Sequence, residues 1–377
     1  MKRKRLLALI MSLALVVVFT AGCDNSGSGG DAAADTGDAA AADAGDAAAG
    51  AVFEGKDVYG LRYKPAGETT GDPADVKIAY IPLSTAGVTN SMVQKALEEQ
   101  IVFYPNITIE YFDPMYDLNK QISMINECVT QGFDAIMLEA ADTEALNITI
   151  ADAEAAGVPV VTINVGASGL HTLHVQGNDY SSGREAGRML AEGINGEGNV
   201  ILLDCPAAQK PISLMGTGFE DYINEEAAGV TLLESQPIDN WSPEIANTVM
   251  RDLLTKYDDI DGVYAVSDDI AQGAVQAIEA AGRQNEIKVY GSMGYPNTLQ
   301  AIKDGKVYGT YFSDGYLEYA TALYLTILMI ETGITSVNAG YTATPVIDMP
   351  TVPTTAANVE NVIKDSRWET LGLYEFK

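Results

Sequence analysis

The chain has 377 residues, 47% of them hydrophobic, which is enough for about two domains with cores of their own. Asp and Glu number 52 against 22 Lys and Arg, and the resulting formal charge of −30 repels nucleic-acid phosphates and anionic lipid headgroups. Three cysteines cannot frame a disulfide-stapled fold, and two histidines leave little scope for a zinc site or histidine acid–base chemistry. Because of the large negative charge, we expect no nucleic-acid partner.

Residues 1–22 have the pattern of a signal peptide. Basic residues at 2–5 precede an apolar run at 6–19, which is too short to span a bilayer comfortably as a helix. The segment TAGC at 20–23 resembles the lipobox of bacterial lipoproteins, and the resemblance implies cleavage before Cys23 and lipidation of its thiol. Such a protein is anchored to the membrane by lipid chains rather than by a spanning helix. The alternative is an ordinary cleavage site beside a free cysteine.

Residues 23–74 are expected to form a lipid-anchored flexible linker. Positions 24–50 hold only alanine, glycine, aspartate and four small polar residues, so nothing large and apolar is available to bury. An alanine-rich helix is the alternative, but the repeated glycines and the absence of cationic partners for the aspartates disfavour it. The globular part should begin near Asp75.

From Asp75 onwards, short β-rich runs alternate with segments of helical length. Strands are expected at 76–83, 107–113, 134–140, 159–165, 172–177, 199–205, 231–238, 262–267, 287–293 and 308–314. This alternation predicts an α/β fold with parallel sheets covered by helices on both faces. The segments DAIMLEAAD (134–142) and DGVYAVSDD (261–269) are each followed by EAAG, so we expect two similar Rossmann-like domains.

Sheets of this kind bind ligands beyond the carboxyl ends of their strands. The candidate ligand-binding residues at these positions are Thr85, Asn90, Asn164, Trp241, Ser267, Asp268, Met293, Ser313 and Asp314. Ser, Asp and Asn at strand-to-helix junctions are more often helix N-caps, and Asp268 in particular is expected to be one. Trp241 has no capping role, so it either stacks on a ligand or packs on its own helix.

Several motifs together resemble the ribose-type (type I) periplasmic binding proteins, the solute-binding lipoproteins of sugar ABC importers. The motifs are VKIAYIPLST (76–85), QGFDAI (131–136), AGVPVVTIN (156–164), GNDYSSG (177–183), DDIAQGA (268–274) and IKDGKV (302–307). The resemblance implies two lobes that close over one ligand, with a hinge of three chain crossings near 177–179, 314 and 342–345. The N-terminal lobe is then 75–178 plus 314–342, and the C-terminal lobe is 179–313 plus 343–377.

Departures from the family pattern bear on the ligand. Asn164-Val165 stands where the family often has Asp-Arg, Met215 replaces a usual arginine, and Ser267 and Met293 replace Asn and Asp. Ribose is therefore a poor candidate, because the hydroxyls of a buried sugar need hydrogen-bond partners. The remaining amides and hydroxyls, together with the apolar surfaces of Met215, Met293 and Trp241, favour a less polar or deoxygenated sugar, a polyol derivative or a small non-sugar metabolite.

Three functions remain open. The leading interpretation is an extracytoplasmic, monomeric lipoprotein that captures a sugar-like solute and delivers it to an ABC permease with its ATPase. The second is a ligand-loaded sensor subunit for a membrane receptor or kinase. The third is a surface enzyme, which is disfavoured because the chain has neither a P-loop nor a Gly-x-Ser-x-Gly motif.

The remaining candidate chemistry is sparse, and no cofactor is expected. His171 and His174 have no third histidine or cysteine beside them, so we predict no metal site there. Cys128 and Cys205 fall in different predicted domains and should be buried free thiols.

Overall fold

Two six-stranded sheets organise the globular part of the chain. The computed structural model describes residues 75–86, 88–210 and 213–377, so the predicted signal peptide, Cys23 and linker lie outside the described residues. The strand orders are β11-β5-β4-β3-β1-β2 and β12-β10-β9-β8-β6-β7. Without the end strands β11 and β12, both sheets have the order 2-1-3-4-5 of a doubly wound fold. The predicted α/β class with two Rossmann-like lobes is confirmed.

The first lobe is built on a wholly parallel sheet. Its strands are β1 (Val76–Ile81), β2 (Ile107–Tyr111), β3 (Ala135–Leu138), β4 (Val160–Ile163), β5 (Leu173–Gly177) and β11 (Val346–Met349). Its helices are α2 (Val88–Ile101), α3 (Leu118–Thr130), α4 (Asn147–Ala155), α10 (Gly315–Thr332) and α11 (Ser336–Ala339). Every residue of β3 and β4 is buried, as a sheet covered on both faces requires.

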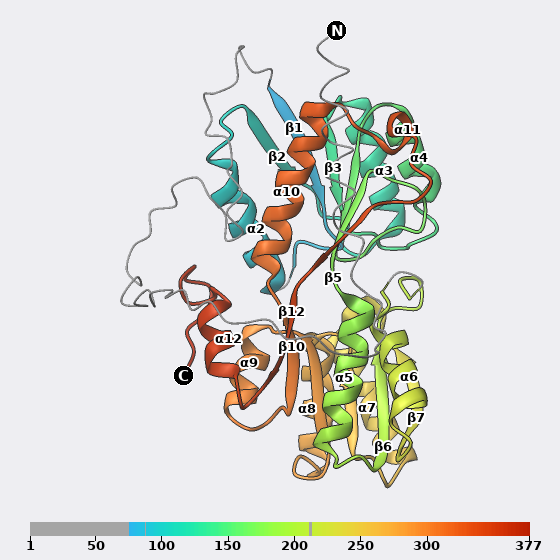
Figure 1. Ribbon diagram of the computed structural model, residues 1–377, viewed down its shortest axis with the longest axis vertical. Helices are drawn as coiled ribbons and strands as arrows, with labels where there is room; N and C mark the ends of the chain where they lie inside the picture. Colours follow the sequence, from blue (N-terminus) through green and yellow to red (C-terminus); the bar gives the residue numbers. More distant parts are fainter. Residues whose placement is uncertain (1–74, 87, 211–212) are drawn as a thin grey trace, which may run out of the picture. The chain divides into compact units, whose positions relative to one another are not determined.

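Alternate residues of β1 enter two different cores of this lobe. Ile78 and Tyr80 pack on the face covered by α2 and α10, whereas Ala79 and Ile81 pack on the face covered by α3 and α4. Helix α10 returns from far along the chain to lie beside α2 (Figure 1). A helix late in the sequence thus completes the first lobe.

The second lobe repeats this arrangement. Its strands are β6 (Gly198–Asp204), β7 (Val230–Pro237), β8 (Gly262–Ala265), β9 (Lys288–Met293), β10 (Gly309–Ser313) and β12 (Thr351–Thr355), of which β12 runs antiparallel to β10. Its helices are α5 (Asp179–Gly193), α6 (Met215–Glu226), the 3-10 turn η1 (Asp239–Trp241), α7 (Pro243–Lys256), α8 (Asp268–Ala280), α9 (Pro296–Lys303) and α12 (Val359–Asp365). Helix α5 packs against α6, and α7 packs against α8.

The chain passes between the lobes three times: at Asn178 after β5, at Asp314 after β10, and at Pro350 between β11 and β12. The third crossing lies later than the expected stretch 342–345, because β11 pairs with β5 in the first sheet. Residues 343–349 therefore belong to the first lobe, which corrects the expected start of the C-terminal lobe at 343. Proline brackets this short edge strand on both sides, and such a strand resembles a loop in sequence.

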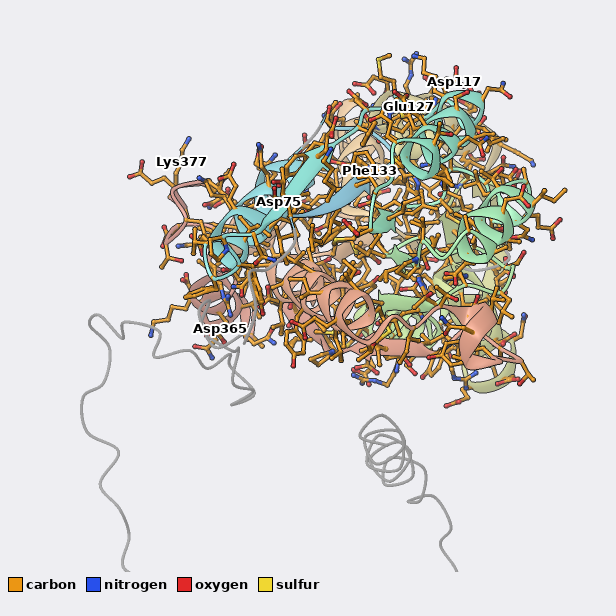
Figure 2. The ribbon with its side chains drawn as sticks, turned by 90° about the horizontal axis from the view of Figure 1, so that it is seen from above. Asp75, Asp117, Glu127, Phe133, Asp365 and Lys377 are labelled. Atoms are coloured by element: carbon orange, nitrogen blue, oxygen red, sulfur yellow. The ribbon has the colours of Figure 1, made fainter. Side chains whose placement is uncertain are left out.

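Local sequence features place the helices. Asp117 caps α3 by accepting a hydrogen bond from the Lys120 backbone N–H at 3.0 Å, and Phe133 beyond the other end packs in the core against Phe112. Figure 2 shows Asp117 at the outer surface and Phe133 farther inside. Cys128 and Cys205 are buried free thiols, as predicted. Within the described part of the chain, no helix is both long and apolar enough to cross a bilayer.

Candidate ligand-binding site

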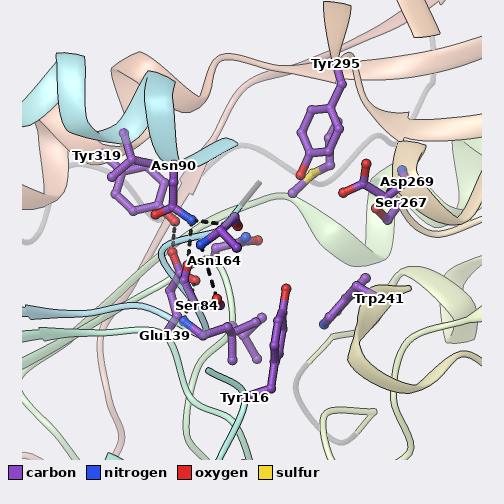
Figure 3. Close-up of a pocket in the computed structure, with 15 residues that line it drawn as sticks. Ser84, Asn90, Tyr116, Glu139, Asn164, Trp241, Ser267, Asp269, Tyr295 and Tyr319 are labelled. Atoms are coloured by element: carbon purple, nitrogen blue, oxygen red, sulfur yellow. Dashed lines mark hydrogen bonds between the residues drawn. The ribbon is translucent and has the colours of Figure 1, made fainter. Parts of the chain in front are cut away.

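A cavity of about 90 Å³ lies at the carboxyl ends of strands from both sheets. The first lobe contributes the segments after β1, β2, β3 and β4, and the second contributes η1, the start of α8 and the end of β9 (Figure 3). The reversal of strand order at β1/β3 and β6/β8 opens a crevice at these ends, and ligands bind at such points in doubly wound sheets. A smaller cavity of about 30 Å³ adjoins it and shares Asn164, Met293, Tyr295 and Tyr319.

Six of the ten predicted ligand-binding residues line these cavities. Asn90, Asn164, Trp241, Ser267 and Met293 line the larger one, and Ser313 lines the smaller one. Trp241 is half-buried, lines the cavity and also packs against the core of its own lobe. Packing against its own lobe and contact with a ligand are therefore both possible for Trp241 at the same time.

Thr85 and Asp314 line neither cavity. The Thr85 hydroxyl donates to a carboxylate oxygen of Asp113 at 2.6 Å, and Asp314 caps α10 by accepting from the Leu317 backbone N–H at 3.1 Å. Both side chains therefore have structural partners, and their contact with a ligand stays a prediction.

Met215 and Asp268 also line neither cavity. Met215 is the first residue of α6 and is buried in the core of the second lobe, where its sulfur accepts from the Tyr311 hydroxyl. Asp268 is fully buried and accepts from the Tyr295 backbone N–H at 2.6 Å and the Thr310 hydroxyl at 2.9 Å. Asp268 fastens α8 to the neighbouring strands, and its neighbour Asp269 faces the cavity instead.

Glu139 lines the cavity and is absent from the predicted set. It follows β3 and accepts hydrogen bonds from the hydroxyls of Tyr80 and Tyr319 and from the Leu83 backbone N–H. Burial raises the pKa of Glu139, and these three donors oppose that rise. The sequence signal that could have identified Glu139 is its position as a carboxyl directly after an apolar strand.

Three aromatic or acidic side chains on other segments complete the cavity. Tyr116 comes from the segment after β2, Asp269 from the first turn of α8, and Tyr295 from the segment after β9. Burial, followed by the nearby Glu244 carboxylate, raises the pKa of Asp269 to about 6. Figure 3 shows the Asp269 carboxyl directed into the space between Tyr295 and Trp241.

The backbone is unusual at four lining residues. Tyr116, Asn164, Trp241 and Met293 have φ angles of 60°, 58°, 54° and 98°. Positive φ is rare outside glycine and costs about 1–3 kcal/mol per residue, so it persists where the surrounding structure enforces it. Four of the eight non-glycine residues with positive φ in the described part of the chain thus line this one cavity, and strain of this kind often clusters at functional sites.

The two histidines are joined to each other through a hydroxyl. The Thr162 Oγ1 atom lies 2.7 Å from Nε2 of His171 and 2.8 Å from Nδ1 of His174. Burial lowers the pKa of both imidazoles, that of His171 to about 4. No group of three or more potential metal ligands occurs among the residues that the structure describes.

Comparison with known sequences finds a matching protein family and several similar proteins. The model of the family described as periplasmic binding protein domain matches residues 78–333. A xylitol-binding protein of Mycolicibacterium smegmatis is 28% identical over 58% of this chain and 62% of its own length. A fructose import binding protein of Bifidobacterium longum is 31% identical over 50% of this chain and 59% of its length. The chain thus spans about three fifths of these relatives.

Solved structures share the fold. A Bacillus halodurans ABC transporter solute-binding protein with bound myo-inositol has a TM-score of 0.69 at 24% identity, over 81% of this chain and all of that one. The fructose-binding periplasmic domain of a hybrid two-component system also has a TM-score of 0.69, at 21% identity, over 79% of this chain and 96% of that one. Taken with the family match over 78–333, these findings show that the chain belongs to the periplasmic binding protein domain family.

Proposed function

We propose that this protein captures a sugar or sugar-like small molecule between its two lobes, outside the cytoplasm, and delivers it to an ABC importer. The observation that carries the proposal is one cavity at the carboxyl ends of both sheets, lined by side chains from each lobe. A ligand that contacts both lobes favours their closed arrangement by its differential affinity. The relatives named as a xylitol-binding protein and a fructose import binding protein support this reading.

The cavity has the chemistry for a small polyhydroxylated molecule. Asn90, Asn164 and Ser267 offer amide and hydroxyl groups to ligand hydroxyls, and Trp241 offers a flat apolar surface. No arginine lines the cavity among the described residues, in agreement with the sequence-based argument against ribose. The preferred ligand is accordingly a polyol derivative or a modified sugar.

A second candidate function is ligand sensing. One solved structure with this fold is the fructose-binding periplasmic domain of a hybrid two-component system. Both functions use the same binding event and differ in the membrane partner that receives the loaded protein. Lipid anchoring through Cys23, with residues 23–74 as the linker and the globular part as a monomer, completes the proposal for either function.

The experiment begins with the chain lacking residues 1–22, titrated with sugars, deoxysugars and polyols by isothermal calorimetry. At least one compound should bind and also lower the radius of gyration in solution scattering. Failure of every compound would refute the sugar-like ligand, and binding with unchanged scattering would refute closure.

A second measurement separates the two functions. The neighbouring genes are examined first for a permease and an ATPase. After reconstitution of that permease and ATPase in liposomes, the loaded protein should stimulate their ATP hydrolysis. Stimulation of a neighbouring kinase instead would assign the protein to sensing.

A further inference from the structure

Three carboxyl groups from three separate elements reach the two adjoining cavities. Glu139 after β3 and Asp269 at the start of α8 line the larger cavity, and Glu318 in the first turn of α10 lines the smaller one. None of the described residues lining either cavity is lysine, arginine or histidine. The binding site thus holds three acidic groups and no basic group to balance them.

Two buried carboxyls elsewhere in the described part of the chain serve for comparison. Glu154 accepts hydrogen bonds from two backbone N–H groups on Thr172 and Ser336, and from the hydroxyls of the same two residues. Asp204 accepts a hydrogen bond from the Cys205 backbone N–H at 2.9 Å, and its Oδ2 atom, which has no hydrogen bond, has the Lys210 ammonium group as an ion-pair partner at 2.9 Å. Each of these two acids thus has donors or a cation beside it, as buried polar groups usually do.

Two of the three carboxyls at the site, those of Glu318 and the partly buried Asp269, have at least one oxygen atom with neither a hydrogen bond nor a cation beside it. Glu318 is only 3% exposed, yet its Oε1 atom has no hydrogen-bond partner, and the nearby Ser313 hydroxyl is likewise buried without a partner. Within the described chain, the Asp269 carboxyl takes part in no side-chain hydrogen bond or ion pair. Both acids therefore present oxygen atoms to whatever occupies the cavities.

Aromatic rings surround the same space. Tyr116, Trp241, Tyr295 and Tyr319 line the larger cavity, and the first three of them stand around the Asp269 carboxyl in Figure 3. The faces of such rings attract cations, most strongly where water is excluded. Aromatic rings and carboxyls with unpaired oxygens at the same cavity are thus both compatible with a cationic ligand group.

We propose that the ligand of this site carries a protonated amino group, so that it is an amino sugar or an aminocyclitol rather than a neutral sugar. The inference rests on the proposed function and specifies its ligand. An ammonium group supplies three donors and a positive charge, and charge-assisted hydrogen bonds are about twice as strong as neutral ones. A neutral polyol also donates hydroxyls to these oxygens but leaves the acidic charge of the site unbalanced.

Matched ligand pairs test the charge directly. We would titrate the chain lacking residues 1–22 with D-glucosamine, D-galactosamine, D-mannosamine and an inosamine, each beside its neutral counterpart (for the inosamine, myo-inositol) and its N-acetyl derivative. The N-acetyl compounds keep the nitrogen but lose its charge. At least one amine should bind about tenfold or more tightly than both of its partners.

Variants show which side chains sense the charge. Asp269→Asn preserves shape but removes a charge, and Glu318→Gln preserves shape but removes a carboxyl that can ionise beside an ammonium group. Each substitution should weaken binding of the preferred amine by about tenfold and weaken binding of the neutral counterpart less. Glu279→Gln and Glu331→Gln are the matched controls, because both are exposed acids on the same two helices, α8 and α10. Circular dichroism would check that all four variants fold.

The outcomes separate this inference from the function on which it rests. Tighter binding of a neutral or N-acetylated compound than of its amine would overturn the charged ligand and leave the binding function in place. Equal loss of amine and neutral binding in Asp269→Asn would also overturn it. Absence of binding throughout the panel, neutral compounds included, would count against the sugar-like ligand itself.

Discussion

Trp241 donates its indole N–H to Oε1 of Gln209 at 2.8 Å, and Nε2 of Gln209 in turn lies 3.2 Å from the Ala140 carbonyl oxygen. Trp241 and Gln209 belong to the second lobe, whereas Ala140 follows β3 in the first. The backbone N–H of Thr143 also reaches the Ala208 carbonyl at 3.2 Å. A side chain in the cavity wall is thus linked through one amide to the opposite lobe.

Gln209→Ala should weaken ligand binding by about tenfold. The substitution removes the link between the lobes, so the open form becomes more favourable relative to the closed one. The ligand-free melting temperature should change little, because Gln209 joins the lobes rather than either core. Calorimetry and solution scattering of the loaded protein would measure the effect, with the exposed Gln284→Ala as control. Unchanged affinity would show that the link contributes nothing to closure.

Substitutions at Trp241 separate stacking from the link to Gln209. Trp241→Ala should cost about 2 kcal/mol of binding free energy, roughly thirtyfold in affinity, because an aromatic side chain leaves the centre of the site. Trp241→Phe keeps a ring but loses the N–H donor, so it should resemble Gln209→Ala. Titration of both variants is the measurement. If Trp241→Ala binds normally or fails to fold, the residue belongs to the scaffold.

The sequence predicts the strands well, because a parallel sheet covered on both faces needs nearly continuous apolar runs. It predicts the start of α8 less well. Asp268 and Asp269 are adjacent, but successive residues of a helix point about 100° apart. One carboxyl is therefore buried against the neighbouring strands and the other faces the cavity. Periodicity alone does not reveal which is which.

Long-range contacts explain most of what the sequence could not show. Tyr319 and Glu318 lie on α10 in the first lobe, far along the chain from Glu139, whose carboxylate accepts the Tyr319 hydroxyl. No local pattern connects these residues. Met215 was considered for the site through the family pattern, yet its apolar side chain packs in a core. A single sequence shows which face of a helix or strand is apolar, but it does not show which other element packs against that face.

Glu154→Gln should destabilise the fold without affecting the ligand. Glu154 is 1% exposed and holds together α4, the residue before β5 and the start of α11 through hydrogen bonds to Thr172 and Ser336. An amide can accept at only one of its two ends, so the free energy of unfolding should fall by about 2–3 kcal/mol. Urea denaturation would measure this, with the exposed Glu144→Gln as control. A simultaneous loss of affinity would contradict a purely structural role.

Cys23→Ser should release the protein from membranes. If the thiol carries the lipid, the variant loses its anchor and enters the soluble fraction, because the linker separates the anchor from the fold. Ligand affinity should stay as in the parent. Fractionation of cells would test the release from membranes, and metabolic labelling with a fatty acid would test the lipidation of Cys23. A variant that stays on the membrane would mean that residues 1–22 remain attached.

The ligand-free protein should lose stability as the pH rises, and Glu318 should account for part of that loss. Burial raises the pKa of Glu318 from 4.5 to about 8, with the carboxyls of Asp179, Glu139 and Asp314 adding to the rise and the Asn164 backbone opposing it. Between these two values the folded protein keeps a proton that the unfolded chain has released. The free energy of unfolding therefore falls with increasing pH, by at most about 1.4 kcal/mol per pH unit for one proton.

Glu318→Gln carries no ionisable proton, so this variant should show a shallower decrease in unfolding free energy between pH 5 and pH 8. Some decrease should remain, because burial and the Asp348 carboxylate raise the pKa of Asp179 to about 8 in the same way. Urea denaturation at pH 5, 6.5 and 8 would give the slopes, and Glu331→Gln should keep the parent slope because Glu331 is exposed at the far end of α10. Equal slopes for Glu318→Gln and the parent would mean that Glu318 ionises in the folded protein at the same pH as in the unfolded chain, which would contradict the raised pKa.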